Sequence, residues 1–294
     1  MAFIEYIFSG SKLIRSFFLF QFFFISIFSF GQFETSGARS AALGGSSITQ
    51  QDVFSAQNNQ AGLGFIKSVG VGAYFENRYL LKQLNHSSFL ATIPIKKGTF
   101  GISYNGFGYS QFKQDKFGIA YGILLSENFS VGVQLNYHSI RIGDIYGRAD
   151  ALTAALGFQG KISKQITVAA HIHNLNRTKL ADYNNERMPS VIKLGIQYAY
   201  SEKLNIQLEA DKNSNEKLNF KGGVEYMPAQ DFYLRFGVTS NPNLFSFGTG
   251  FKINTIKIDI SSSYHPVLGF LPQFALHSSF GKVKSEKEIP NEQQ

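Results

Sequence analysis

The segment KFGIAYGILLSENFSVGVQLNYHSIRI, residues 116–142, decides the fold of this chain. Its odd positions from Phe117 to Leu125 and from Phe129 to Tyr137 are all apolar or aromatic, whereas its even positions are mostly small or polar. Such alternation is typical of β-strands, because successive side chains point to opposite faces. The two runs have roughly ten residues each, and a strand that crosses a bilayer needs about 9 to 11, whereas a soluble strand averages about five or six. The segment therefore predicts a hairpin of a membrane barrel.

The composition is that of a chain whose apolar residues are spread along its length. The 294 residues are 44% hydrophobic with a mean hydropathy of only -0.08, and they include 30 Phe and 14 Tyr. Abundant aromatic residues fit the girdles that outer-membrane barrels place at both lipid interfaces. The lack of Cys excludes disulfides, thiolate metal sites and a Cys nucleophile. The net charge of +8 has no basic block behind it, so nucleic acid is not expected as a partner.

One nearly continuous apolar block occupies residues 17–30, behind Lys12 and Arg15. It is too short and too close to the N-terminus for a stable spanning helix, and small and polar residues follow it. We interpret residues 1–31 as a secretory signal peptide that is cleaved before Gln32. The mature chain would then have no transmembrane helix.

Downstream of residue 67, alternation of period two dominates the sequence. We predict an all-β fold, a transmembrane antiparallel β-barrel of about 14 strands at 67–280, since single-chain bacterial outer-membrane barrels have an even number of strands. The predicted location is the outer membrane of a Gram-negative cell, with a disordered periplasmic tail at 281–294. The predicted strands are 68–77, 87–95, 98–107, 115–125, 129–142, 150–162, 165–175, 190–200, 204–212, 219–227, 231–239, 244–253, 255–264 and 271–280.

The predicted connections alternate between short and long. Outer-membrane barrels have short periplasmic turns and longer external loops, so this rhythm predicts that both termini are periplasmic. The short connections are 96–97, 126–128, 163–164, 201–203, 228–230 and 254, and the long ones are 78–86, 108–114, 143–149, 176–189, 213–218, 240–243 and 265–270.

The early strands place small residues on the predicted inward face. A barrel of fourteen strands is wide enough to need filling, and glycine within a strand often marks the close approach of another backbone. We therefore predict that residues 32–66 form an N-terminal plug segment against this small wall, although the glycines could instead only allow the strands to bend. The wall residues are Gly118, Ala120, Gly122 and Gly132, and the plug residues singled out are Arg39, Leu43, Gly44, Gly45, Asn59, Gly62 and Leu63.

The late strands place charged residues on the same face. Mixed signs on neighbouring strands predict ion pairs, because unpaired charge in a confined lumen is costly. This lumen charge network either only fills and rigidifies the barrel or forms the polar wall of a ligand route or partner site. Its predicted members are Lys193, Glu209, Lys221, Glu225, Arg235, Lys252, Lys257 and Asp259.

Three histidines, His138, His171 and His173, also face inward in the predicted strands. A metal site needs three or four converging ligands, and the sequence shows no convergence. Polar lining of the lumen is therefore favoured over a metal site, and no metal or cofactor is expected. A hydrolase is the least favoured function, because no Ser or Asp with a His can be picked out at the outer rim.

The motif GARSAALGG at 37–45, followed by NQAGL at 59–63 and then alternating strands, resembles the PorV/PorQ family of Bacteroidota. That family belongs to the wider FadL-like group of fourteen-stranded outer-membrane proteins, and its members usually have Pro where this chain has Gln60. The resemblance implies a non-enzymatic barrel that binds protein partners as an accessory component of type IX secretion.

The FadL branch of the same group moves hydrophobic compounds, which makes a channel for hydrophobic small molecules the alternative function. Such a channel would need a lateral opening, for which a kink at Pro94 is the candidate sign. The expected partners are therefore outer-membrane lipid and either secretion-machinery proteins or hydrophobic small molecules.

Overall fold

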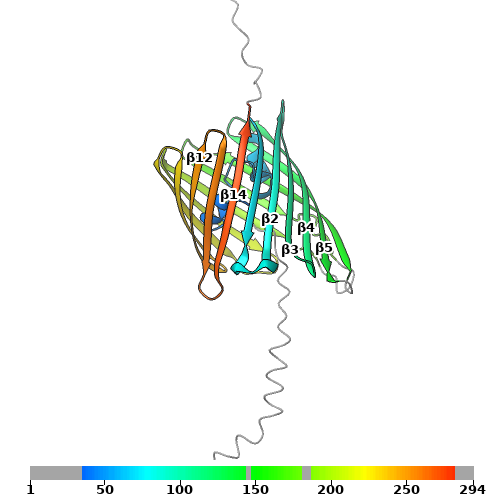
Figure 1. Cartoon of the computed structure of the whole chain (residues 1–294). Coiled ribbons are helices and arrows are strands. Elements are labelled where there is room, and N and C mark those ends of the chain that lie inside the picture. Colours follow the sequence, from blue (N-terminus) through cyan, green and yellow to red (C-terminus); the bar gives the residue numbers. More distant parts are fainter. Residues whose placement is uncertain (1–34, 144–146, 181–186, 282–294) are drawn as a thin grey trace, which may run out of the picture. The chain divides into compact units, whose positions relative to one another are not determined.

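The computed structural model describes residues 35–143, 147–180 and 187–281. The predicted signal peptide and all but the first residue of the predicted tail lie outside these residues. Fourteen antiparallel strands form a closed barrel, in which each strand pairs with its neighbours in the sequence and β1 pairs with β14 (Figure 1). The predicted fold class is confirmed.

The strand bounds follow the alternation of the sequence within a few residues. Each strand is bordered by turn residues or by a loop, as the sequence predicts. The strands are β1 (Val69–Asn77), β2 (Asn85–Ile95), β3 (Gly98–Tyr109), β4 (Phe112–Ser126), β5 (Phe129–Ile142), β6 (Arg148–Lys161), β7 (Ile166–His173), β8 (Val191–Ser201), β9 (Leu204–Asn213), β10 (Asn219–Ala229), β11 (Phe232–Ser240), β12 (Asn243–Ile253), β13 (Ile256–His265) and β14 (Gly269–Phe280).

The hairpin of β4 and β5 shows how residue type fixes the two faces of the barrel. Its ladder runs from Phe112↔Ile142 to Ser126↔Phe129 with one irregularity before the turn. Ile119 and Leu135 are 66% and 68% exposed, whereas Ala120 between the outward residues is buried. An apolar outward face would be unstable in water and is what a bilayer requires.

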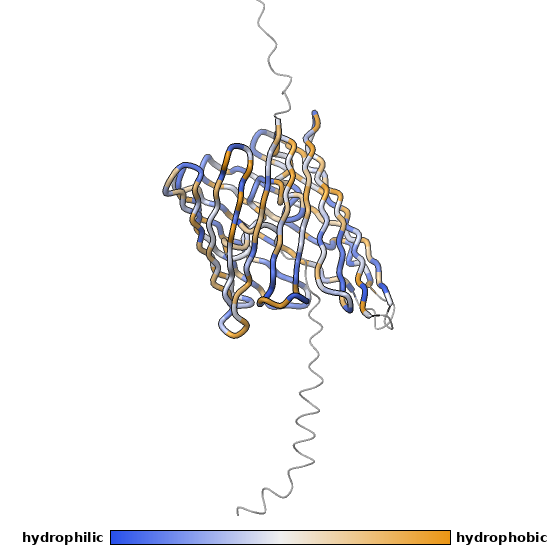
Figure 2. Tube along the Cα trace, in the orientation of Figure 1, coloured by the Kyte–Doolittle hydropathy of each residue, from blue (hydrophilic) through white to orange (hydrophobic). Residues whose placement is uncertain are grey.

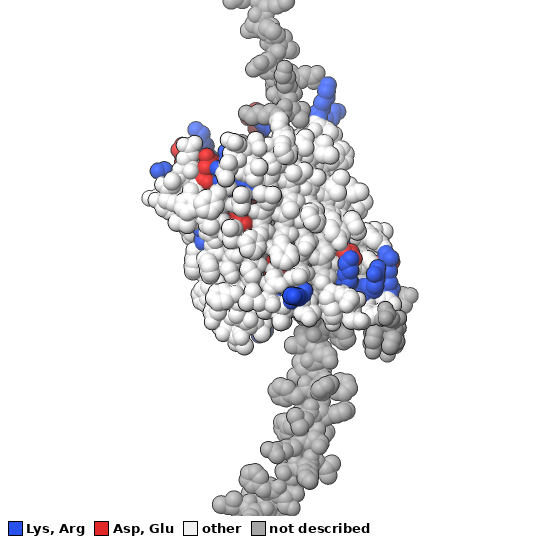
Figure 3. Space-filling view, viewed as in Figure 1, with Lys and Arg blue, Asp and Glu red and all other residues white. Residues whose placement is uncertain are grey.

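The outer surface repeats this pattern around the barrel. Hydrophobic and hydrophilic residues alternate along the strands (Figure 2). On the face shown in Figure 3, charged side chains gather towards the two ends of the barrel and leave a largely uncharged region between them. Among the residues that the structure describes, no helix is long and apolar enough to cross a membrane.

Short helices complete the described chain. Two of them, η2 (Arg78–Leu80) and η3 (Lys82–Leu84), lie in the connection between β1 and β2. The others, α3 (Ala38–Ala42), α4 (Ser55–Asn58) and η1 (Gln60–Phe65), belong to residues 35–66, which we call the N-terminal segment. Most of its residues are buried and the others are half-buried.

Two connections differ from the prediction. Those predicted as long loops at 108–114 and 240–243 are two-residue turns, because the ladders continue to Tyr109↔Phe112 and to Ser240↔Asn243. Lys113 and Gln114 suggested a loop because they are polar, but in the strand Gln114 is buried on the inward face and Lys113 is exposed near the turn. The alternation of short and long connections is therefore only partly correct.

Candidate functional site: the barrel interior and its N-terminal segment

The N-terminal segment lies inside the barrel, where glycines of the wall make room for it. A Cβ atom added at Gly101 would lie 2.8 Å from Cβ of Ala56, and one added at Gly223 would lie 2.6 Å from Cα of Leu43. Cβ atoms added at Gly122 and Gly132 would overlap backbone atoms of Gln60. At these positions glycine permits the close approach of a second backbone.

The segment contacts opposite parts of the wall, which differs from the expectation that it would lie against the early strands alone. Its later part packs on β3, β4 and β5, whereas Leu43 and Gly44 pack on Gly223 of β10 and Gly237 of β11. The late strands combine charged residues with glycines, but only their charges entered the prediction. The three atoms nearest to a Cβ at Gly118 belong to Gln134, Ser103 and Asn136, so the close approach there is between strands.

Glycine and asparagine also shape the segment itself. Gly44 and Gly45 have φ values of 68° and 83°, a region that glycine enters without strain. The side chain of Asn59 donates to the carbonyl of Ile48 at 2.7 Å and accepts from the amide of Ala61 at 3.2 Å. A Cβ at Gly62 would lie 2.6 Å from the carbonyl oxygen of Gln50, so the folded segment has no room for a side chain there.

A chain of buried charges links the segment to the wall. Arg39 of α3 donates from Nε and Nη2 to the carboxylate of Glu225, at 2.9 and 2.7 Å. Glu225 also accepts from Arg235 at 2.6 Å, and Arg235 donates onward to Asp259 at 2.7 Å. Burial alone would lower the pKa of Arg39, but the charge of Glu225 raises it above the usual value. Arg39 therefore stays charged and is held by two hydrogen bonds.

A second anchor holds the turn that follows α3. One oxygen of Glu209, a residue that is only 3% exposed, accepts from the backbone amides of Ser47 and Ile48 at 2.8 and 3.1 Å. Its other oxygen lies 3.7 Å from Nζ of Lys221 and 4.0 Å from Nζ of Lys193. Six of the predicted charged residues therefore lie in contact as two groups. Glu209 contacts Lys193 and Lys221, and Arg235 contacts Glu225 and Asp259.

One predicted member of the network lies apart from it, and another, Lys257, forms no ion pair with it among the described residues. Lys252 shares the inward parity of β12, but it lies at the end of the strand and pairs at 3.7 Å with Asp231 of a turn, both side chains being well exposed. Its inclusion was wrong, because parity fixes the face of a residue and not its height along the strand. Half-buried Lys257 lies over the ring of Tyr233, with its ammonium 5.8 Å from the ring centre.

The three histidines are close to one another and to Lys116, which shares the parity of Gly118 but was not among the predicted site residues. The rings of His138 and His173 lie 5.8 Å apart, and Lys116 is opposite His138 in the ladder. His171 lies 3.2 Å from the side-chain oxygen of Gln60 in the segment. Within the described ranges, no set of three His, Cys, Asp or Glu residues could hold a metal ion.

A small apolar cluster, which was not predicted from the sequence, lies between the segment and the wall. Phe54 and Leu63 of the segment pack in one cluster with Tyr74 of β1, Leu90 of β2 and Ala275 of β14. The signal available was Val53-Phe54, an apolar pair in an otherwise polar and small-residue stretch. The cluster fixes the segment against β1, β2 and β14 by burial of apolar area.

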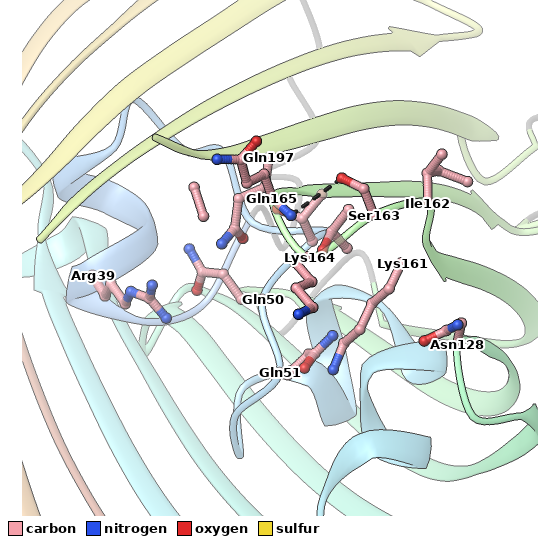
Figure 4. A pocket seen from close by; sticks show the side chains of 13 residues that line it. Arg39, Gln50, Gln51, Asn128, Lys161, Ile162, Ser163, Lys164, Gln165 and Gln197 are labelled. Carbon is pink, nitrogen blue, oxygen red and sulfur yellow. Dashed lines mark hydrogen bonds between the residues drawn. The ribbon is translucent and has the colours of Figure 1, made fainter. Parts of the chain in front are cut away.

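A cavity of about 620 Å³ remains beside the segment, at the end of the barrel where β6 turns into β7 (Figure 4). Its lining is mostly polar and comes from the segment, from the β6–β7 connection and from β8. The lining residues are Arg39, Thr49, Gln50, Gln51, Asn128, Lys161, Ile162, Ser163, Lys164, Gln165, Thr167, Gln197 and Ala199.

The wall near Pro94 shows no break. The β2–β3 ladder runs in continuous register from His86↔Phe107 to Ile95↔Gly98 and includes the pair Pro94↔Thr99. The structure therefore does not support Pro94 as the site of a lateral opening.

Several solved structures share the fold of this chain. Similar solved structures include the toluene transporter TbuX of Ralstonia pickettii, with a TM-score of 0.66 and 12% identity over 84% of this chain and 99% of that one. The toluene transporter TodX of P. putida gives 0.62 and 11% over 86% and 100%, and a FadL homologue of Pseudomonas aeruginosa gives 0.55 and 13% over 84% and 98%.

At such low identities these similarities show a shared fold. The similar structures include a FadL homologue, and none of them bears on the PorV/PorQ resemblance. No protein-family model and no curated protein matches the sequence.

Proposed function

We propose that this protein is an outer-membrane channel for small molecules in which the N-terminal segment acts as a plug. The observation that carries the proposal is the closed barrel with a segment folded inside it and a cavity left beside that segment. The barrel shares its fold with the two toluene transporters, which favours transport over the secretion role.

The plug is attached through contacts that can be broken singly. Glu225 binds Arg39, and Glu209 binds the backbone amide of Ser47. The glycines of the wall pack closely against the segment but form no side-chain hydrogen bond with it. Such polar anchors favour one position of the segment while they leave other positions accessible at a moderate cost in free energy. We therefore place the gate at the Arg39–Glu225 ion pair.

The lengths of the connections support the proposed orientation. The end of the barrel that carries residues 96–97, 127–128 and 202–203 has short turns, and the other end carries the connection from β7 to β8, the longest one. With the short turns in the periplasm, both termini of the barrel domain are periplasmic, and so is the cavity of Figure 4.

A liposome swelling assay tests the proposal. The purified barrel is reconstituted beside a variant lacking residues 33–66, and swelling in isosmotic solutions of small solutes is compared. Faster swelling of the deletion variant, with its barrel folded as judged by heat-modifiable gel mobility, is the expected result. Equal impermeability of both folded proteins would refute the channel.

A second function is supported by a specific observation, the attachment of the segment to the neighbouring strands β9 and β10 through the Arg39–Glu225 ion pair and through the hydrogen bonds that Ser47 and Ile48 donate to Glu209. A filled barrel of this kind suits an accessory protein that binds secretion-machinery partners, as the resemblance to the PorV/PorQ family implies. Co-purification of a defined secretion component in mild detergent, and a secretion defect on deletion of the gene, would favour this function over transport.

A further inference from the structure

We propose that the cavity beside the N-terminal segment binds small polar organic anions, and that such anions are the solutes of the channel. The inference rests on the proposed transport function for its second half only. It differs from what the similar structures suggest, because toluene is apolar and uncharged whereas this cavity is lined by cations and amides.

The charge of the lining is one-sided. Arg39, Lys161 and Lys164 contribute to the cavity, and no Asp or Glu does. Arg39 is neutralised from its other side by Glu225 and by Asp52, whose carboxylate lies 3.7 Å from Nη1. Within the part of the chain that the structure describes, no ion pair joins Lys161 or Lys164 to a carboxylate. The two lysines therefore supply the excess positive charge.

Lys161 is held in position between the wall and the segment. It lies at the end of β6 on the inward face, two residues from the buried Gln159. Its ammonium sits 4.4 Å from the ring centre of Phe65, the last residue of η1. A cation over an aromatic face keeps its charge and still has N–H groups to donate. Lys161 can thus present those groups to a solute in the cavity.

The amides around the lysines can bind the rest of a polar solute. Figure 4 shows Lys161 and Lys164 reaching towards Gln51, with Gln165 and Gln197 across the cavity. Among the described residues, the side-chain amides of Gln51, Gln165 and Gln197 form no hydrogen bond with the protein. An amide both donates and accepts, which suits hydroxyl and carbonyl groups. An apolar solute would displace water from these groups and give them no hydrogen bond in return.

The volume matches this class of ligand. Small-molecule sites span about 300–1,000 Å³, and the cavity of about 620 Å³ lies within that range. A carboxylate on a hydroxylated chain of a few carbons would place its charge at Lys161 and Lys164 and its hydroxyls at the amides. The positive lining would also concentrate anions at the periplasmic end of the barrel.

Calorimetric titration of the full barrel in non-ionic detergent with gluconate and with glucose tests the inference. The two solutes have similar size and hydroxyl content, and only gluconate carries a carboxylate. We expect gluconate to bind, glucose to bind at least about tenfold more weakly, and the double variant Lys161→Gln/Lys164→Gln to lose at least about tenfold in gluconate affinity. The matched control Lys67→Gln/Lys97→Gln removes the same charge from exposed positions outside the cavity and should bind as the unaltered barrel does.

Equal binding of gluconate and glucose, absence of gluconate binding, or equal losses in both double variants would each overturn the inference. Liposome swelling separates it from the proposed function. If the deletion variant swells at the same rate in glucose and in gluconate, the proposed channel function stands and the proposed preference for anions is refuted. If gluconate binds more tightly than glucose but no liposomes swell, the anion site stands and the proposed channel function is refuted.

Discussion

The substitution Arg39→Met should release the N-terminal segment from the barrel wall. Methionine keeps much of the length and apolar stem of arginine and removes the two hydrogen bonds to Glu225, at 2.9 and 2.7 Å. Glu225 keeps its bond to Arg235 at 2.6 Å, so the variant does not leave an isolated buried carboxylate. The change therefore tests the anchor of the segment and not the folding of the barrel.

The magnitude follows from the kind of bond that is lost. A hydrogen bond to a charged group contributes about 1.5–3 kcal/mol, so the two bonds together could contribute about 3–6 kcal/mol. Because Glu225 retains Arg235 and the Arg39 side chain is 20% exposed, we expect a smaller loss of about 2–4 kcal/mol. Since about 1.4 kcal/mol corresponds to a factor of ten, the population with a released segment should rise roughly 30-fold to several hundredfold.

Hydrogen exchange of the segment amides measures this population directly, because local opening sets the exchange rate. The amides of Ala41 and Gly45, bonded to the carbonyls of Gly37 and Ser40, should exchange faster by that factor, while the ladder amides of β4 and β5 keep their rates. The control Arg148→Met breaks an exposed ion pair with Asp150 and should change neither set. Unchanged exchange at Ala41 and Gly45 in the Arg39 variant would refute the anchor.

Three further predictions concern the wall of the barrel. Gly122→Ala places a methyl group against the backbone of Gln60 and 2.7 Å from Cβ of Leu63, and should lower the free energy of unfolding in urea by about 1–3 kcal/mol. The methyl of the control Gly118→Ala meets only the ends of side chains and should lower it less. Equal losses would contradict the packing of the segment. Leu135→Arg, at an outward position in the middle of β5, should lower the free energy of folding into vesicles by about 2–4 kcal/mol in magnitude. The control Val267→Arg lies in the β13–β14 turn and should change it little. A tolerated Leu135→Arg would argue against a lipid-facing strand. Lys252→Met should change stability by less than about 1 kcal/mol, since its ion pair is exposed; a loss like that expected for Arg39→Met would return Lys252 to the buried network.

The strands could be predicted from the sequence because their pattern is local. In residues 116–142 the polarity of each side chain indicates which face of the strand it occupies. The length of each alternating run matches the thickness of the bilayer that the strand crosses. The turns were less predictable, because polar residues such as Lys113 and Gln114 are compatible with a loop and also with a strand, in which Gln114 faces the polar interior.

The inward face could be listed from parity, but its pairings could not. Parity places Glu209, Glu225 and Lys252 on the same face, yet height along the strand and the fold of the segment decide that the first two bind residues 39–48 and the third binds a turn. The contacts of Arg39 with Glu225 join residues far apart in the chain, and no local pattern encodes such a distance.

The sequence alone thus determined the closed barrel, since hydrogen bonding and lipid exposure act on each strand through its own residues. The tertiary structure decided where the N-terminal segment lies and which space it leaves. Gly122 and Gly237 make room for one segment from two sides of the wall, and the cavity with Lys161 and Lys164 is the volume that this segment does not fill. Such a volume depends on the packing of the whole interior, which no single stretch of sequence contains.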